Sequence, residues 1–189
     1  MISRRGPILL ALLRHAETQW SAEGRIQGRA DPPLLAGASC RLPQECRDLR
    51  IVTSPLARCV QTAALLGAPQ APREPRLIEM HWGAWQGRRL EDLRRELGDA
   101  MRENEARGLD FRPEGGESPR EVAERVMGWI KELKEPTLGI THRGVIRAVL
   151  AQATGWDMTG KPPAKLDWQA VHLFRIDGGR PRVDKLNLK

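Results

Sequence analysis

The sequence lacks tyrosine and is poor in other aromatic residues. Of its 189 residues none is Tyr, two are Phe and six are Trp, so aromatic side chains make up only 4% of the chain. Proteins that bind single-stranded nucleic acid stack bases on aromatic side chains, and no DNA- or RNA-binding motif is recognisable here. We therefore expect no nucleic-acid partner, although the net charge is +7 and the pI is near 10.0.

Cysteines are also few, and long apolar runs are absent. The three cysteines (Cys40, Cys46 and Cys59) form no CxxC pair, so they suggest neither a disulfide framework nor a zinc site and predict a reducing, cytoplasmic environment. No apolar run approaches the roughly 18 residues of a membrane span, and we expect no membrane partner. The short run 8–13 ends in Arg14-His15 rather than in a small-residue cleavage site, which favours a buried strand.

Lysine is scarce beside arginine, with 6 Lys against 25 Arg. A guanidinium group is planar and binds phosphate or carboxylate through two parallel hydrogen bonds. The charges are scattered, and several Arg stand beside acidic residues, as in 91–96, which is typical of a solvated helix face. The arginine excess indicates small anionic partners, and its scatter argues against a charged polymer.

Apolar runs of strand length alternate with helical patterns, and the length fits one domain, residues 1–189. Strands are expected at 7–13, 50–53, 137–141, 170–176 and 182–188, the last two forming a hairpin around Gly178-Gly179, and a brief strand or an extended segment is expected at 76–79. Helices are expected at 54–66, with Ser54 as its N-cap, at 90–106 and at 145–154. A further helix is expected behind the Ser118 capping box, and an interrupted one over 34–48. This order predicts an α/β fold, a three-layer α/β/α sandwich whose mostly parallel sheet has helices on both faces and a C-terminal hairpin.

In such sheets the functional side chains lie beyond the carboxyl ends of the strands. Those ends carry Arg14-His15, Thr53-Ser54 with Arg58 one helical turn later, Glu79, and Thr141-His142. If the strands are parallel, two histidines, two arginines and one carboxylate converge on one rim. The free N–H groups at the start of the helix that bears Arg58 would face the same crevice and favour an anion.

These residue types suit phosphoryl transfer. A neutral histidine can attack phosphorus and carry the phosphoryl group, while a second histidine and the guanidinium groups bind the phosphoryl oxygens. A glutamic acid whose pKa is raised can protonate the leaving oxygen. Because arginine and histidine supply the positive charge, we expect no metal and no other cofactor.

Ordered motifs surround these residues through most of 8–155. They are 13–20, 24–28, 31–34 with Gly37, 54–58, 61–63, 77–79 with Gly83, Trp85 and Gly87, 115–118, and 141–142. In order and spacing they resemble the motifs of the histidine phosphatase superfamily, which includes cofactor-dependent phosphoglycerate mutases and many acid and sugar phosphatases. The resemblance implies that His15 is the phosphorylated nucleophile, within a phosphate pocket of Arg14, Arg58 and His142.

The resemblance also assigns the proton donor to Glu79, for which the alternative is a structural carboxylate that caps the next turn. Gln27 stands where a side chain often contacts the phosphate. Ser21 stands where Asn is usual, so it is a candidate for a phosphate hydrogen bond that Asn would make. Arg143 stands where Gly is usual. Its side chain either projects over the pocket and selects an extra anionic group, or points to solvent.

The sequence therefore predicts a metal-independent phosphatase that hydrolyses a small phosphomonoester through a phosphohistidine. Phosphoryl transfer of the phosphoglycerate mutase type is the alternative, although such mutases are usually longer than 189 residues. A phosphate-recognising module without catalysis is a third hypothesis, against which all four central positions are present. The substrate and the oligomeric state are left open.

Overall fold

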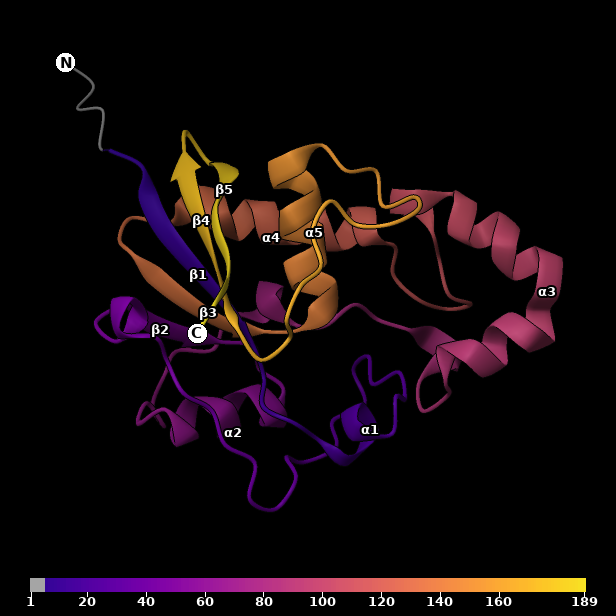
Figure 1. Ribbon diagram of the computed structural model, residues 1–189, viewed down its shortest axis with the longest axis horizontal. Coiled ribbons are helices and arrows are strands. Elements are labelled where there is room, and N and C mark those ends of the chain that lie inside the picture. Colours follow the sequence, from indigo (N-terminus) through magenta and orange to yellow (C-terminus); the bar gives the residue numbers. More distant parts are fainter. Residues whose placement is uncertain (1–5) are drawn as a thin grey trace.

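A five-stranded sheet forms the centre of the molecule, in the order β2-β3-β1-β4-β5 (Figure 1). Its strands are β1 (Ile8–Arg14), β2 (Arg50–Thr53), β3 (Thr137–Thr141), β4 (Val171–Asp177) and β5 (Arg180–Leu188). The pairs β1–β3 and β2–β3 are parallel, whereas β4 is antiparallel to both β1 and β5. Four strands therefore share one direction, which confirms a mostly parallel sheet with a C-terminal hairpin. The computed structural model describes residues 6–189, so the first five residues of the expected domain 1–189 lie outside it.

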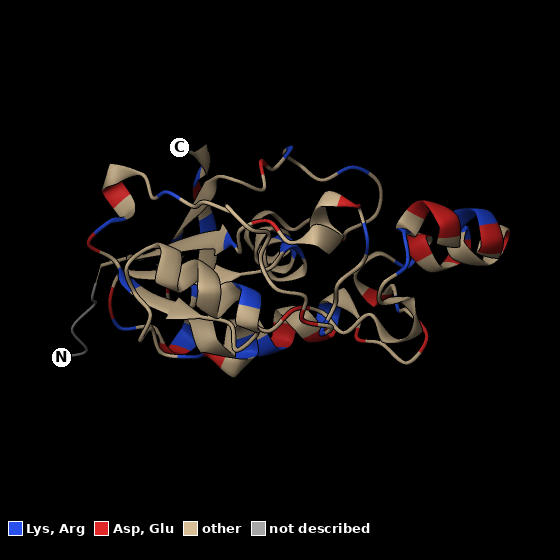
Figure 2. Cartoon of the chain, turned by 90° about the horizontal axis from the view of Figure 1, so that it is seen from below, with Lys and Arg blue, Asp and Glu red and all other residues tan. Residues whose placement is uncertain are grey.

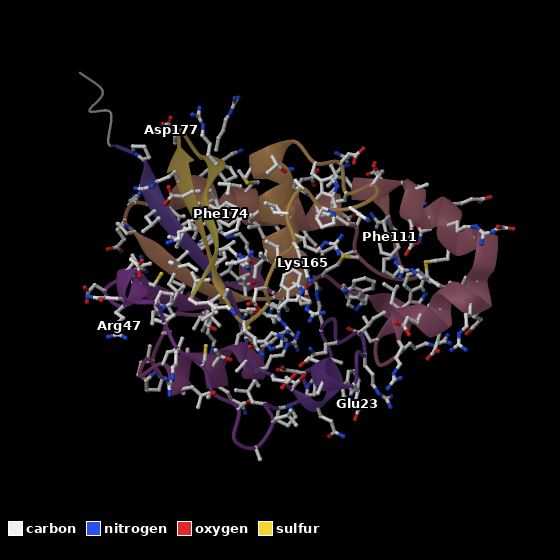
Figure 3. The ribbon with its side chains drawn as sticks, in the orientation of Figure 1. Glu23, Arg47, Phe111, Lys165, Phe174 and Asp177 are labelled. Atoms are coloured by element: carbon white, nitrogen blue, oxygen red, sulfur yellow. The ribbon has the colours of Figure 1, made fainter. Side chains whose placement is uncertain are left out.

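Helices cover both faces of the sheet. Along β1, Leu10 and Leu12 point to one face and Ala11 and Leu13 to the other, as alternation in a strand requires. The first face packs against α4 (Pro119–Glu132) and α5 (Arg143–Thr154), with Phe174 of β4 in the same core (Figure 3). The second face packs against α2 (Ala57–Leu65) and the 3-10 helix Gln44–Cys46. The expected three-layer sandwich is confirmed.

The predicted charged helix and the capping box are also confirmed. Helix α3 (Leu90–Ala106) spans the expected residues, with a break at Gly98, whose φ is +50°. Figure 2 shows α3 at one end of the molecule with acidic and basic residues along its ribbon. At α4 the Ser118 side chain accepts from Glu121 N–H, and the Glu121 carboxylate accepts from Ser118 N–H. No helix among residues 6–189 combines the length and the apolar character needed to cross a membrane.

Three sequence predictions about local structure are wrong. Residues 76–79 form no strand, because Pro75 opens a 3-10 helix, Pro75–Leu77, in which the Glu74 side chain accepts from Arg76 N–H. Residues 34–48 contain only the 3-10 helix Gln44–Cys46, since Gly37 has a φ of +79° and Pro43 interrupts any helix. Helix α2 begins at Ala57, not at the expected Ser54-Pro55.

The late start of α2 has a tertiary cause. Its first N–H groups are capped by a distant side chain, because the Asp31 carboxylate accepts from Ala57 N–H and Arg58 N–H. Asp31 thus provides the cap that was expected from Ser54, whose hydroxyl has another partner. Two shorter segments complete the fold near the site. They are helix α1 (Gln19–Ala22) and the 3-10 helix Gly83–Trp85.

Candidate active site

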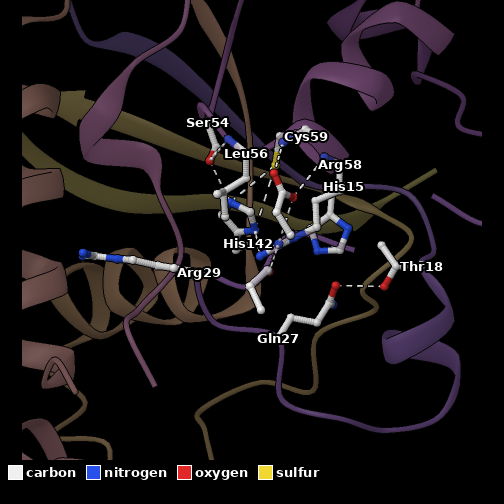
Figure 4. A network of polar contacts seen from close by, with 12 residues as sticks. His15, Thr18, Gln27, Arg29, Ser54, Leu56, Arg58, Cys59 and His142 are labelled. Carbon is white, nitrogen blue, oxygen red and sulfur yellow. Dashed lines mark hydrogen bonds and ion pairs between the residues drawn. The ribbon is translucent and has the colours of Figure 1, made fainter. Parts of the chain in front are cut away.

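The carboxyl ends of three parallel strands bring the two candidate histidines together. In the sheet, Arg14 of β1 is level with Thr141 of β3. The chain continues this pairing for one residue, because His15 N–H donates to the Thr141 carbonyl at 2.9 Å. As a result, the ring centroids of His15 and His142 lie 5.3 Å apart (Figure 4). The predicted convergence of the strand ends is therefore observed for these residues.

The His15 imidazole is buried and has a defined proton position. Its Nδ1 lies 2.7 Å from the Ala16 carbonyl oxygen, which only accepts, so Nδ1 carries the hydrogen and Nε2 keeps its lone pair. Burial and the positive charges of Arg14 and Arg58 hold the pKa of His15 well below its usual range. The ring is therefore neutral near pH 7, with Nε2 available as a nucleophile.

Arg58 is a fully buried cation that one loop surrounds. Its Nη1 donates to the Ala30 carbonyl at 2.8 Å and to Asp31 Oδ1 at 3.3 Å. Its Nη2 donates to the Gly28 carbonyl at 2.8 Å and to His142 Nδ1 at 3.2 Å (Figure 4). Among the described residues, Arg58 Nε has no hydrogen-bond partner although it is buried. The guanidinium is thus held in place with one N–H group left to bind an anion.

His142 is held between Arg58 and the end of β2. Because a guanidinium only donates, His142 Nδ1 accepts from Arg58, and His142 Nε2 then donates to Ser54 Oγ at 2.8 Å. The thiol of Cys59 packs 3.4 Å from the same Nε2. Burial and the charge of Arg58 hold the pKa of His142 well below its usual range. The second histidine is therefore neutral, and its orientation is fixed.

Glu79 reaches the rim from a loop rather than from a strand. Its side chain is buried, and Oε1 accepts from Met80 N–H at 2.8 Å and from Gly144 N–H at 3.1 Å. Burial raises the pKa of Glu79 above its usual value, against the opposing effect of these hydrogen bonds and of Arg58. A carboxyl group with a raised pKa is suited to donate a proton.

Arg14, Gln27 and Ser21, which were also expected in the site, differ in how many of their polar atoms already have hydrogen-bond partners. Arg14 Nε is buried and has no partner among residues 6–189, and burial together with the Arg143 charge lowers the pKa of Arg14 to about 10. Gln27 Oε1 accepts from Thr18 Oγ1 at 2.8 Å, which fixes the orientation of its amide group (Figure 4). The Ser21 hydroxyl accepts from Thr18 N–H and donates to the Thr18 carbonyl, so it is used in the cap of α1.

Three supporting residues were not assigned a role in the site from the sequence. Ser54 was expected to cap a helix but pairs with His142, and Asp31 pairs with Arg58 and caps α2. Gly144 gives its N–H to Glu79 and leaves no space for a side chain there, since a Cβ at this position would meet Glu79 Oε1. Asp31 stands in one of the recognised motifs, which is the one signal that pointed toward it.

Together these groups form a cationic site with hydrogen-bond donors that lack partners among the described residues. Within residues 6–189, Arg14 and Arg58 each have a buried Nε–H without a hydrogen-bond partner, and such orphaned donors are stabilised by an anionic oxygen. Among the described residues, no group of three or more His, Cys, Asp and Glu side chains is placed to hold a metal ion.

Comparison with known proteins finds relatives named as a phosphatase and as a probable mutase, and a solved structure of similar fold. The chain is 30% identical, over 80% of its length and 71% of the relative's, to a protein of Arabidopsis thaliana named metal-independent phosphoserine phosphatase. It is 36% identical, over 62% of its length and 59% of the relative's, to a probable phosphoglycerate mutase of Cronobacter sakazakii. The crystal structure of the protein TTHB049 from Thermus thermophilus superposes with a TM-score of 0.74 at 32% identity, covering 96% of this chain and 100% of that one.

The sequence profile of the histidine phosphatase superfamily (branch 1) matches residues 10–189. This range contains every strand of the sheet but the first residues of β1, and it contains the whole rim where the histidines and arginines meet. The relatives' names agree with a site built for a phosphoryl group. The chain therefore belongs to the histidine phosphatase superfamily and is an enzyme that acts on phosphomonoesters.

Proposed function

We propose that this protein is a metal-independent phosphatase that hydrolyses a small phosphomonoester through a phosphohistidine at His15. The observation that carries the proposal is the hydrogen bond from His15 Nδ1 to the Ala16 carbonyl, 2.7 Å long. It leaves Nε2 as the free nitrogen of a buried, neutral ring. The name of the Arabidopsis relative supports hydrolysis without a metal and makes phosphoserine the first substrate to test.

In this proposal the phosphoryl group is bound by three side chains, those of Arg14, Arg58 and Gln27. Arg14 and Arg58 donate to its oxygens through N–H groups that have no partner within residues 6–189. We assign the free amide NH₂ of Gln27 to the same group, since its Oε1 accepts from Thr18 Oγ1. The His142 ring, whose centroid lies 5.3 Å from that of His15, orients Arg58 by accepting from its Nη2. Fixed cationic donors stabilise charge that spreads over the phosphoryl oxygens in the transition state. Ser21 is left out because its hydroxyl is engaged in the cap of α1.

The first chemical step transfers the phosphoryl group to the enzyme. The lone pair of His15 Nε2 forms a bond to phosphorus as the bond between phosphorus and the ester oxygen breaks. The protonated carboxyl group of Glu79 gives its proton to that oxygen, so the alcohol leaves in neutral form. Burial, which raises the pKa of Glu79, keeps this proton available.

The second step regenerates the enzyme. A water molecule attacks phosphorus while the Glu79 carboxylate takes one of its protons, and the P–N bond breaks. The bonding electrons return to His15 Nε2, and inorganic phosphate is released. Glu79 is then protonated again and His15 neutral, so both groups are ready for the next substrate.

Trapping of the intermediate tests the proposal. Wild-type protein is mixed with phosphoserine that carries labelled phosphate and is denatured at short times. We expect a labelled protein that is stable to alkali, labile to acid and absent in His15→Ala. His81→Ala is the matched control and should keep the label, because the His81 ring pairs with the Gly115 carbonyl and makes no hydrogen bond to His15, Arg58 or His142 within residues 6–189. Label that persists in His15→Ala would show that another residue is phosphorylated.

Two further measurements separate the alternatives. The Cronobacter relative's name favours a mutase as the second candidate, so interconversion of 2- and 3-phosphoglycerate is assayed beside phosphate release, with 2,3-bisphosphoglycerate present. A mutase rate that equals or exceeds the hydrolysis rate would replace the proposal. Full hydrolysis after treatment with EDTA supports metal independence, whereas no label and no turnover over a broad panel of phosphomonoesters would indicate a module without catalysis.

A further inference from the structure

A second cationic surface adjoins the phosphoryl pocket. A groove of about 990 Å³ contains Arg14, His15 and Trp168, and a neighbouring hollow of about 650 Å³ contains Arg14, Trp168, Arg143 and Lys165. Arg14 and Trp168 line both spaces, so the two lie side by side. A small molecule whose phosphorus lies at His15 can therefore extend toward Arg143 without leaving the protein surface.

Arg143 is placed to bind an anion in this hollow. Its guanidinium carbon lies 5.0 Å from the centroid of the Trp168 ring, so the cation stacks on the indole. The Arg143 side chain makes no hydrogen bond within residues 6–189 and is exposed, so its N–H groups are available to a ligand. Among the described residues no carboxylate lies within ion-pair distance of Arg143 or of Arg14. Two guanidinium groups thus line the hollow, and neither has an ion-pair partner within residues 6–189.

The charge around these two arginines is positive overall. Lys189 forms an ion pair with Asp167 at 2.8 Å, so these two side chains neutralise each other. Of the other ionisable residues that line the hollow, Arg14, Arg143 and Lys165 are cationic, and Glu17 alone is acidic. Arg14 and Arg143 line the same hollow.

The wall that carries Trp168 is held rigidly. Asn187 on β5 accepts from Asp167 N–H at 2.7 Å and donates to the Lys165 carbonyl at 3.0 Å. Asn187 N–H in turn donates to Nδ1 of the buried His172 at 3.3 Å, and the His172 ring lies edge-on to Trp168 at 6.4 Å. The connection between α5 and β4, in which Figure 3 places Lys165, is thereby fixed beside Arg143.

We infer that Arg143, stacked on Trp168, determines specificity by binding a carboxylate of the substrate while the phosphoryl group lies at His15. A carboxylate matches the two parallel N–H groups of a guanidinium edge. The substrate class is a small phosphomonoester that also carries a carboxylate. This inference rests on the proposed function, since it concerns the substrate of the same site.

Substrates that differ only in the carboxylate test the inference. Phosphoethanolamine is phosphoserine without its carboxylate, and in glycerol 3-phosphate a CH₂OH group replaces the carboxylate of 3-phosphoglycerate. We expect Arg143→Met to lower the ratio of kcat/KM for phosphoserine over phosphoethanolamine about 10- to 100-fold, because one charged hydrogen-bonded contact is lost. The change is expected mainly in KM for phosphoserine, and the second pair of substrates should follow the first.

A matched control is available on the same helix. Arg147 lies one turn further along α5 and stacks on Trp156 at 5.2 Å, outside both lined spaces. Arg147→Met should keep the wild-type ratio. A ratio that changes by less than about 3-fold in Arg143→Met would overturn the inference, and so would equal losses on both substrates, since a 3-fold change is well below one charged hydrogen bond.

Two further measurements complete the test. The first measures binding without turnover, and the second distinguishes a carboxylate from a second phosphate as the anion that Arg143 binds. Binding of phosphoserine and phosphoethanolamine to His15→Asn is measured by calorimetry, and Arg143→Met should weaken only phosphoserine. If the wild type hydrolyses nothing, the proposed function fails while this binding result still decides the inference. If Arg143 discriminates fructose 1,6-bisphosphate from fructose 6-phosphate but not phosphoserine from phosphoethanolamine, the subsite binds a second phosphate and the carboxylate assignment is wrong.

Discussion

Nη2 of Arg58 lies 3.2 Å from Nδ1 of His142, and this contact fixes the protonation of the second histidine. A guanidinium is charged at every working pH, so it donates, and the imidazole accepts in its neutral form. His15 is neutral for a related reason, because Arg14 and Arg58 lie near its buried ring. The arginines therefore have two roles in the proposed mechanism, as ligands of the phosphoryl group and as a cause of the histidines' neutral state.

The two limbs of the pH dependence of kcat/KM should report the protonation of His15 and the deprotonation of Glu79. Protonation of His15 removes the nucleophile, and because its pKa is lowered, the acidic limb should lie below pH 6.5. Deprotonation of Glu79 removes the acid, and its raised pKa places the alkaline limb above 4.5. In Arg14→Met the loss of a positive charge raises the pKa of His15, so the acidic limb should move to higher pH. Arg14→Lys keeps the charge and should leave the limb where it is; an unmoved limb in Arg14→Met would contradict this account.

Glu79→Gln should separate activity from stability. Because the folded protein favours the protonated carboxyl, the Glu79 carboxylate destabilises the fold progressively as pH rises from 4.5 through the raised pKa. The neutral amide removes this cost and still accepts from Gly144 N–H through its oxygen. We expect kcat to fall about 10²- to 10⁴-fold, the usual contribution of a general acid, while the Tm at pH 7 does not fall. Thermal unfolding at pH 5 and pH 7 checks the sign, since the wild type should lose stability between them relative to the variant.

Gly144→Ala should impair catalysis through Glu79. The added Cβ would overlap Glu79 Oε1 and also approach Met80 Cβ at 3.2 Å, so the carboxyl group must move. Displacement of a general acid by about 1 Å can cost about 100-fold in rate, and kcat should fall accordingly. Gly128→Ala is the control, because a Cβ on α4 at Gly128 meets nothing within 4 Å and should raise stability by about 0.5–1 kcal/mol. Equal rates in the two variants would argue against a catalytic Glu79.

Asp31 should affect both stability and phosphate binding. Asp31→Ala removes the acceptor for the first N–H groups of α2, which costs about 1 kcal/mol in typical caps, and also the ion pair with Arg58, 3.3 Å long. Asp31→Asn keeps a capping oxygen but removes the charge. Urea unfolding should therefore rank wild type above Asp31→Asn and Asp31→Ala lowest. Inhibition by inorganic phosphate, measured in parallel, reports whether Arg58 is still oriented; an unchanged inhibition constant in Asp31→Ala would contradict the positioning role.

The sheet could be predicted from the sequence where the signal is local. The strand 50–53 agrees with β2, 137–141 with β3, and 90–106 with α3, because apolar runs and helical spacing depend only on neighbouring residues. The start of α2 could not be predicted, since its cap is Asp31, distant in sequence. At 76–79 the apolar Leu77-Ile78 pattern favoured a strand, but Pro75 and the Glu74 cap impose a 3-10 turn.

For the candidate site as well, local motifs could be recognised in the sequence, whereas contacts between distant residues could not. Parallel strand ends and family motifs indicated His15, His142 and Arg58, and the geometry brings them together. Proton positions and neutral rings depend on hydrogen bonds and burial, which a sequence does not reveal. The sequence also left open whether the Arg143 side chain projects over the pocket or points to solvent. Its direction depends on Trp168, on which it stacks and which lies 25 positions away in the sequence. For Ser21 the motif position indicated phosphate binding, whereas the local helix cap uses its hydroxyl.

The loop around Arg58 has a consequence for local unfolding. Three acceptors of its guanidinium, the Gly28 and Ala30 carbonyls and the Asp31 carboxylate, come from one short segment, which also caps α2. If this loop detached while the sheet stayed intact, a fully buried cation would lose most of its partners at once, which is energetically costly. The loop and the first turn of α2 therefore form one cooperative unit, so the phosphate pocket opens as a whole or stays closed.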